Sequence, residues 1–152
     1  AHRVLDGDPY VSQTLGGRRI QRWKHPIKKM ENTLYKASHV KHPSNLWVRA
    51  SQNHYNWLYE MWTHLCDEYT HRYGKVHLTD KKLREMLQSA PMQIDVEPYV
   101  DPYLAMPDDV KQTNVVEAYK NYYINYKKDF AKWTNRPVPE FMNFETHAGY
   151  AS

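Results

Sequence analysis

The chain has 152 residues, of which 41% are hydrophobic, so its size fits one ordinary domain and argues against a two-domain enzyme. The formal net charge at pH 7 is +4, and an aromatic fraction of 14% argues against disorder. The single Cys excludes an intramolecular disulfide and any multi-cysteine metal site, and no apolar stretch approaches the roughly 18 residues that span a bilayer. We therefore expect one folded intracellular domain over residues 1–152, with no membrane partner.

Residues 1–42 are predicted to form a basic, loop-rich arm. They contain Asp6-Gly7-Asp8-Pro9, Gly16-Gly17 and Pro26, which are turn-forming combinations. This arm is expected to hold at most short helical pieces. Because no alternation of apolar and polar residues is sustained anywhere in the chain, no strand is predicted.

The positive charge is concentrated in the first 50 residues, which hold 10 Lys or Arg and 3 Asp or Glu. Basic side chains that neutralise phosphates, interleaved with rings that stack on bases, are typical of a nucleic-acid surface. The alternative is a solvated loop, which a charge run alone favours. The stacking residue is predicted to be Trp23, and the predicted phosphate contacts are Arg18, Arg19, Arg22, Lys24, Lys28, Lys29 and Arg49.

Helices are predicted between residues 43 and 90. Pro43 followed by Ser44 begins a short one. From residue 52 to residue 73, apolar side chains recur at the i, i+3, i+4, i+7 spacing of a helix, and Gly74 supplies a left-handed cap. A shorter helix is predicted from Thr79 to Gln88.

Residues 91–113 are predicted to be an acidic connector, because Pro91, Pro98, Pro102 and Pro107 preclude a regular helix. We expect it to be extended and draped over the domain. An alternative is that it docks against the basic segment and neutralises it.

A last helix is predicted over residues 114–134, where Asn114 and Glu117 have the spacing of a capping box. Its lysines flank a stripe of aromatic rings, so Lys127 and Lys128, with Arg136 beyond the helix, are predicted as a second set of phosphate contacts. The expected fold class is a mainly α single domain of about three to five helices with long irregular connections.

One face of the 52–73 helix carries two histidines and two carboxylates on successive turns, and such a set of side chains can hold a metal or provide a general base. A solvated helix face explains the same pattern more simply, because Glu and His pairs at i, i+4 are routine there. We therefore predict no metal and no cofactor. The weak candidates for metal ligands are Glu60, His64, Asp67 and His71.

Two parts of the chain resemble a group of small uncharacterised proteins encoded by tailed phages. The matching motifs are His42-Pro43-Ser44-Asn45-Leu46-Trp47, Cys66-Asp67-Glu68-Tyr69, Arg72-Tyr73-Gly74-Lys75, Ala118-Tyr119-Lys120-Asn121-Tyr122-Tyr123, Phe130-Ala131-Lys132-Trp133 and Arg136-Pro137-Val138-Pro139-Glu140. The resemblance implies a virus-encoded protein of the host cytoplasm, or alternatively of the virion. In that group the sequence extends upstream of Ala1 with a further helix, so we expect this chain to be a trimmed or processed form.

The order of parts is more remotely similar to phage pyrimidine-dimer DNA glycosylases, which have a long central helix followed by a Tyr- and Lys-rich segment. Those enzymes cut the strand with an N-terminal amine and a nearby Glu, and neither group can be placed in this sequence. The similarity implies a helical DNA-binding architecture. Whether the protein is an enzyme stays open, and no catalytic residue is predicted.

The leading functional prediction is a phage-encoded protein that binds DNA or another nucleic acid, including a divergent glycosylase-like repair protein. The alternative is a virion-associated structural or protein-interaction module without catalytic activity, with a protein partner or a second copy of itself. A steep fall of DNA affinity with salt distinguishes the first prediction from the second.

Overall fold

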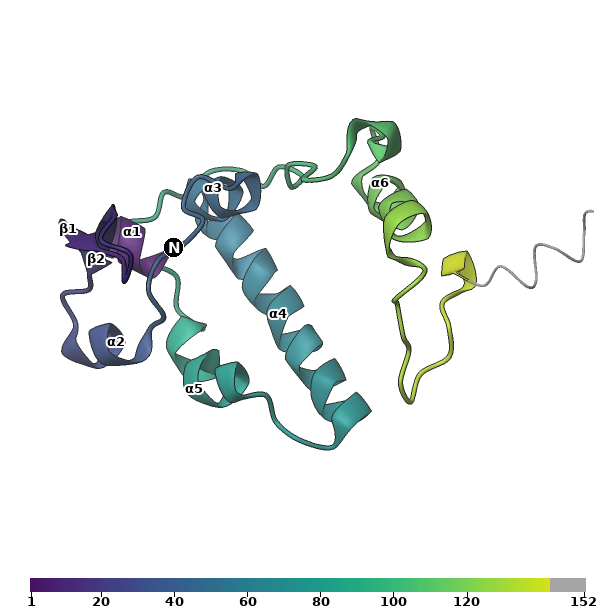
Figure 1. Ribbon diagram of the computed structural model, residues 1–152, viewed down its shortest axis with the longest axis horizontal. Helices are drawn as coiled ribbons and strands as arrows, with labels where there is room; N and C mark the ends of the chain where they lie inside the picture. The colour runs from purple at the N-terminus through teal and green to yellow at the C-terminus, as the bar shows by residue number, and fades with distance from the viewer. Residues whose placement is uncertain (143–152) are drawn as a thin grey trace, which may run out of the picture.

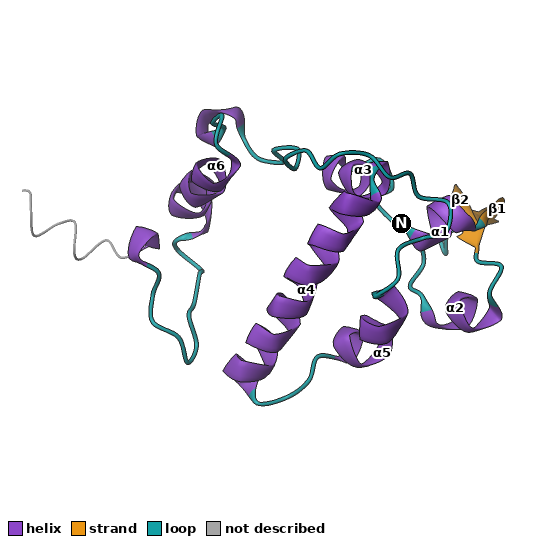
Figure 2. Ribbon diagram, turned by 180° about the vertical axis from the view of Figure 1, so that it is seen from behind, coloured by secondary structure: helices purple, strands orange, loops and turns teal. Residues whose placement is uncertain are grey.

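The computed structural model describes residues 1–142, so the last ten residues of the predicted 1–152 domain lie outside the described part. Within residues 1–142 the protein is mainly α, as predicted, with six α-helices and one two-stranded sheet (Figures 1 and 2). The count is one above the predicted range of three to five, and two of the six helices are short and lie in the arm: α1 (His2–Asp6) and α2 (Lys28–Thr33). None of the helices in this part of the chain is long and apolar enough to cross a membrane.

The central element is α4 (Gln52–Tyr73), whose predicted bounds are confirmed. Ser51 caps its start, because the hydroxyl of Ser51 accepts a 3.1 Å hydrogen bond from the backbone N–H of Asn53. Gly74 ends it at φ 65°, a conformation that glycine adopts without a side-chain penalty. Helices α3 (Pro43–Ala50) and α5 (Leu78–Leu87) flank α4 and also confirm the helices predicted there.

The prediction of no strands is wrong, because the arm contains a hairpin. Strand β1 (Asp8–Gln13) pairs antiparallel with β2 (Arg19–Lys24), in a register that runs from Asp8 opposite Lys24 to Gln13 opposite Arg19. Gly17 closes the turn at φ 80°. The strands carry polar side chains on both faces, so the alternation that identifies a half-buried strand in a sequence is missing here.

The last helix is shorter than predicted. Helix α6 (Val115–Tyr122) begins at the predicted cap, where the side chain of Asn114 accepts from the backbone N–H of Glu117. It widens into a π-helical turn over Tyr123–Lys127 and does not continue to residue 134. The ring of Phe130 is 65% exposed, so the distal part of the predicted stripe has little to pack against. Helical stability comes mostly from such packing, which explains the early end.

The connector over residues 91–113 lies across the junction of α3 and α4 and contains no α-helix or strand, only a 3₁₀ turn at Asp108–Val110. The indole N–H of Trp47 donates to the carbonyl of Val100 over 2.9 Å. The hydroxyl of Ser51 donates to the carbonyl of Glu97 over 2.6 Å. No ion pair within the described residues joins the connector to the hairpin or α2, so its acids do not neutralise that segment.

Candidate nucleic-acid interface

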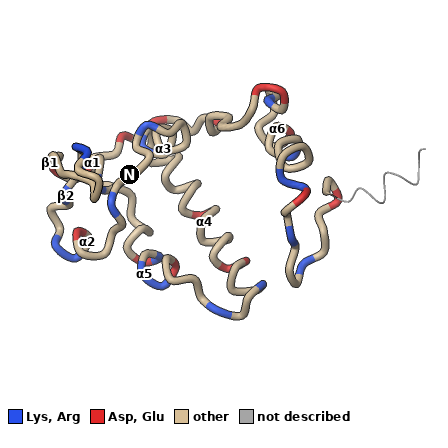
Figure 3. Tube along the Cα trace, in the orientation of Figure 1, with Lys and Arg blue, Asp and Glu red and all other residues tan. Residues whose placement is uncertain are grey.

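The predicted phosphate contacts of the arm gather on one lobe of the molecule, made of the β1–β2 hairpin and α2. In Figure 3, Lys and Arg residues (blue) mark the trace at the hairpin and at α2. Five of these cations are exposed and make no ion pair or side-chain hydrogen bond with any described residue: Arg18, Arg19, Lys24, Lys28 and Lys29. Their charges are therefore available to a partner.

The acids of this lobe do not cancel that charge. The carboxylate of Glu31 is bound by the guanidinium of Arg3 and by the backbone N–H of His25, and these bonds hold the pKa of Glu31 below its usual value. The side chain of Asp6 is 2% exposed and faces inward. Only Asp8, opposite Lys24, stays exposed among the acids of the hairpin.

A hollow of about 850 Å³ lies between α2 and α5. Lys29 lines it from α2, and Lys81 and Lys82 line it from α5. The two lysines of α5 are exposed and form no ion pair with any residue of the described chain. Two acids also line the hollow, but Asp80 is paired with Arg84, which leaves Glu85 as its exposed acid. The walls therefore carry an excess of positive charge.

An exposed ring stands beside this hollow. Tyr35 is 52% exposed, and the ammonium group of Lys82 lies 5.8 Å from the centre of its ring. The Tyr35 hydroxyl lies 3.3 Å from that of Thr79 at the start of α5. A ring beside unpaired lysines is the arrangement that stacks on a base while phosphates are neutralised. Tyr35, Lys81 and Lys82 are not among the predicted contacts, because they become neighbours only when α5 folds against the arm.

Three predicted contact residues have bonding roles inside the protein. The guanidinium of Arg22 donates to the carbonyl of Ala37 over 2.7 Å. Arg49 donates to the side chain of Asn45 and to the carbonyl of Val40, and burial lowers its pKa. Trp23, the predicted stacking residue, is half-buried, and its carbonyl accepts from Arg3.

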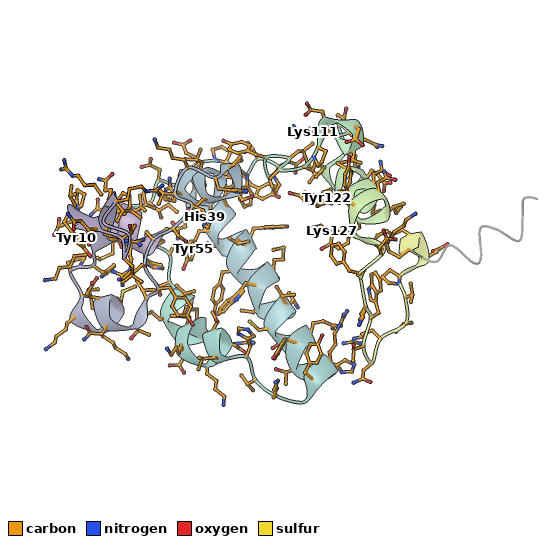
Figure 4. The ribbon with its side chains drawn as sticks, viewed as in Figure 1. Tyr10, His39, Tyr55, Lys111, Tyr122 and Lys127 are labelled. Carbon is orange, nitrogen blue, oxygen red and sulfur yellow. The ribbon has the colours of Figure 1, made fainter. Side chains whose placement is uncertain are left out.

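The predicted second set of contacts lies at the far end of the molecule, on the other side of α4 (Figure 1). Figure 4 shows the same separation between Tyr10 on the hairpin and Lys127. Arg136 is paired with Glu68 over 2.9 Å, and the ammonium of Lys127 lies over the rings of Tyr122 and Phe130, 5.2 Å from each centre. Lys128 follows the π-helical turn. The two sets therefore do not line one groove.

The four weak metal candidates on α4 do not converge. Glu60 and His64 are 76% exposed and 4.0 Å apart. Asp67 accepts from Arg84 over 2.8 Å, and the Nε2 atom of His71 lies 3.2 Å from the carbonyl oxygen of Asn135. Two of the four are thus engaged with other parts of the chain.

A different cluster of metal-ligand type was missed by the sequence analysis. His2, Asp6 and His25 each place one ligand atom within 4.8 Å of the other two. His2 and Asp6 are four residues apart on α1, and the unpredicted hairpin returns His25 to that helix. Burial lowers the pKa of His2 to about 4, so its ring is neutral at pH 7. The one signal in the sequence was the His-x₃-Asp spacing, which is common by chance.

An apolar groove of about 300 Å³ separates α4 from α5. Its walls include Leu58, Trp62 and Leu65 of α4 and Leu87 of α5. Leu65 is 62% exposed, and Met61 beside it is 45% exposed. The α4 helix therefore presents apolar surface that the described part of the chain does not cover.

Comparison with protein-family models, with curated proteins and with solved structures found no match to this chain.

Proposed function

We propose that this protein binds nucleic acid, with DNA as the favoured partner, through a basic surface formed by the hairpin, α2 and α5. The observation that carries the proposal is the hollow between α2 and α5, whose lysines have no ion-pair partner among residues 1–142. A duplex or single strand presents a row of phosphates, and each unpaired Lys or Arg that approaches one releases a condensed counterion.

The surface recognises the sugar-phosphate backbone and not a base sequence. Lysine ammonium groups contact phosphates as point charges and carry no sequence information. The exposed ring of Tyr35 adds a stacking site, which favours single-stranded or locally opened DNA, because a paired base is already stacked. The remote similarity of the order of parts to phage pyrimidine-dimer DNA glycosylases supports DNA over RNA.

The proposal is tested by fluorescence anisotropy with labelled single- and double-stranded DNA at low ionic strength. Wild-type protein is expected to bind both, and the single strand more tightly. The double variant Lys81→Gln/Lys82→Gln is expected to weaken binding by about tenfold or more, since each lost phosphate contact removes one released counterion.

The matched control for this variant is Lys111→Gln/Lys120→Gln, which removes the same two charges far from the hollow. Lys111 and Lys120 already pair with Asp108 and Glu117, respectively. An equal loss of affinity in both double variants means that only net charge matters, and it contradicts a surface at α2 and α5.

A second candidate function, a protein-interaction module, is favoured by the apolar groove between α4 and α5. Exposed apolar patches beside a groove mark interaction sites in many proteins. Sedimentation over a range of concentrations tests self-association: a dimer that Met61→Glu dissociates supports this candidate, and a monomer at every concentration contradicts pairing of two copies through this face.

A further inference from the structure

Three side chains of metal-ligand type meet beneath the hairpin, in the part of the protein where α1, the end of β2 and the connector come together. His25 is 2% exposed and His2 is 6% exposed, and the side chain of Asp6 is 2% exposed. The Nε2 atom of His25 is buried and has no hydrogen-bond partner, although it lies 3.9 Å from Oδ2 of Asp6. Buried polar atoms are nearly always bonded, so this nitrogen requires an explanation.

We propose that His2, Asp6 and His25 bind one divalent transition-metal ion of the zinc class. Two imidazole nitrogens and one carboxylate oxygen are a ligand set that zinc accepts, and a fourth position is completed by water or another oxygen or nitrogen donor. Magnesium and calcium are disfavoured, because both prefer oxygen ligands throughout.

The geometry needs a modest contraction to hold such an ion. Tetrahedral bonds of about 2.0–2.1 Å place neighbouring ligand atoms about 3.3 Å apart. The three ligand atoms now lie within 4.8 Å of one another, and the His25 and Asp6 atoms are 3.9 Å apart. Small rotations of the side chains are enough to bring them to that spacing, because the backbone that carries all three is already in place.

The groups around the ligands orient two of them. The Tyr55 hydroxyl donates to the carbonyl of Leu87 and lies 2.8 Å from Nε2 of His2, so this nitrogen donates its proton to Tyr55 and the metal would be bound by Nδ1. The backbone of Ser89 also hydrogen-bonds to the His2 ring. The carboxylate of Asp6 accepts 2.8 Å bonds from the backbone N–H groups of Met92 and Gln93. It keeps free lone pairs for a metal, and such outer bonds typically support metal ligands.

His25 must exchange one bond for another. Its Nδ1 accepts from the backbone N–H of Ile27 over 3.1 Å, so in the metal-free protein Nε2 carries the proton. When a metal takes Nε2, the proton moves to Nδ1 and the bond from Ile27 is lost. Losing one hydrogen bond lowers the affinity by about tenfold, which is small beside the affinity of sites with several imidazole and carboxylate ligands.

The ion would connect α1 to the end of β2 directly, and to the connector through Asp6. α1 supplies His2 and Asp6, the residue after β2 supplies His25, and Asp6 also holds the start of the connector. The site is independent of the basic surface, which lies outside it, so either proposal can be wrong without the other.

The test is equilibrium dialysis of chelator-treated protein against Zn²⁺, with thermal unfolding of the same samples. One tightly bound ion per chain and a raised melting temperature are expected. His25→Gln is expected to lower the affinity by at least about 100-fold. Tyr55→Phe, which removes the bond to His2 together with the bond to the carbonyl of Leu87 but no metal ligand, is expected to lower it by about 10- to 100-fold. The control His64→Gln removes an exposed imidazole of α4 and is expected to bind like wild type.

Because a substitution at the buried His25 also perturbs folding, the wild-type protein provides a second readout. Long-range ¹⁵N–¹H spectra of the histidine rings should show the signals of His2 and His25 shifting with one equivalent of Zn²⁺. The proposal is overturned if no stoichiometric zinc binds, if a folded His25→Gln protein binds it as wild type does, or if only the signals of His64 or His71 move.

Discussion

Arg3 and Glu31 form an ion pair that joins α1 to α2, the two helices that precede and follow the basic hairpin in the sequence. Arg3 is 7% exposed, and each of its five N–H donors is used. Besides the Glu31 carboxylate, the guanidinium donates to the backbone carbonyls of Trp23, Glu31, Leu34 and Tyr35. The buried Arg3 thus holds together the lobe of the hairpin and α2, whose predicted phosphate contacts are mostly exposed.

Replacing Arg3 by Lys is expected to destabilise the protein by about 3 kcal/mol or more, because at least two of the five hydrogen bonds from the charged group are lost at about 1.5–3 kcal/mol each. The guanidinium of Arg spreads its five donors over a planar fork, whereas the ammonium of Lys offers three donors from one nitrogen. Lys therefore cannot reach all of the carbonyls that Arg3 binds. Urea denaturation measures the loss. Arg18→Lys, on the exposed turn of the hairpin, should change the free energy of unfolding by less than about 0.5 kcal/mol. Equal effects of the two substitutions would contradict the role given to Arg3.

Gly7, between α1 and β1, is required because the backbone passes too close for a side chain. Its φ is −91°, so conformation alone does not demand glycine. A Cβ there would overlap the carbonyl oxygen of Arg3 and come within 3.0 Å of that of Lys24. Gly7→Ala is therefore expected to destabilise the protein by about 1–3 kcal/mol.

The matched control for Gly7 is Gly16→Ala in the hairpin turn, where the nearest atom to an added Cβ is 3.9 Å away. Thermal unfolding of the two variants compares them directly. A Gly7→Ala protein as stable as Gly16→Ala would mean that α1 does not meet β2 in the way described.

His54 holds the connector to the centre of the molecule. Its Nε2 accepts from the backbone N–H of Val100 over 3.0 Å, so Nδ1 carries the proton and donates to the carbonyl of Trp47 over 2.7 Å. Its ring stacks on that of Trp47 at 4.2 Å between centres. His54→Leu leaves the N–H of Val100 unpaired, at a cost of about 1–3 kcal/mol. Hydrogen exchange of the Val100 amide should accelerate by about tenfold or more, whereas His64→Leu on the exposed face should leave it unchanged.

The helices of residues 43–90 could be predicted because their signals are local. Ser51 and Gly74 bound α4 within its own sequence, and a side-chain period of 3.6 residues needs no partner to be seen. The hairpin could not be predicted in this way, because both faces of its strands carry polar residues. α6 has the local signals of a longer helix, but Phe130 stays 65% exposed among the described residues, and tertiary packing decided where the helix ends.

The candidate sites were predicted only where a single segment carries them. The predicted phosphate contacts of the arm lie in one run, and five of them are exposed as the charge pattern indicated. Arg22 and Arg49 look the same in the sequence, but each bonds to a carbonyl that only the fold brings near. The hollow between α2 and α5 and the cluster at His25 combine distant segments, and no spacing rule indicates them.

The segment that contains Trp133 and Arg136 is attached to α4 through Glu68, and this attachment is expected to depend on pH. Hydrogen bonds from Arg136 and from Arg72 hold the pKa of Glu68 below its usual value of 4.5. The detached carboxyl therefore binds a proton more readily than the attached one. The attachment is stable above pH 4.5 and weakens as the pH falls below it.

Hydrogen exchange of the Arg136 amide, which donates to the carbonyl of Trp133, reports this attachment after correction for the intrinsic effect of pH. Protection should fall between pH 5 and pH 3 in wild type. Glu68→Gln should show low protection at both values with no step, and a step of the same size in that variant would assign the pH dependence to another group.

The central claim, that unpaired cations around the α2–α5 hollow bind nucleic acid, is tested most directly by the salt dependence of DNA binding. The logarithm of the binding constant is measured against the logarithm of salt concentration for wild type, Lys81→Gln/Lys82→Gln and Lys111→Gln/Lys120→Gln. The predicted result is a steep slope that lessens by about two in the first double variant and stays at the wild-type value in the second. A slope that does not differ among the three proteins, or no binding at low salt, would contradict the claim.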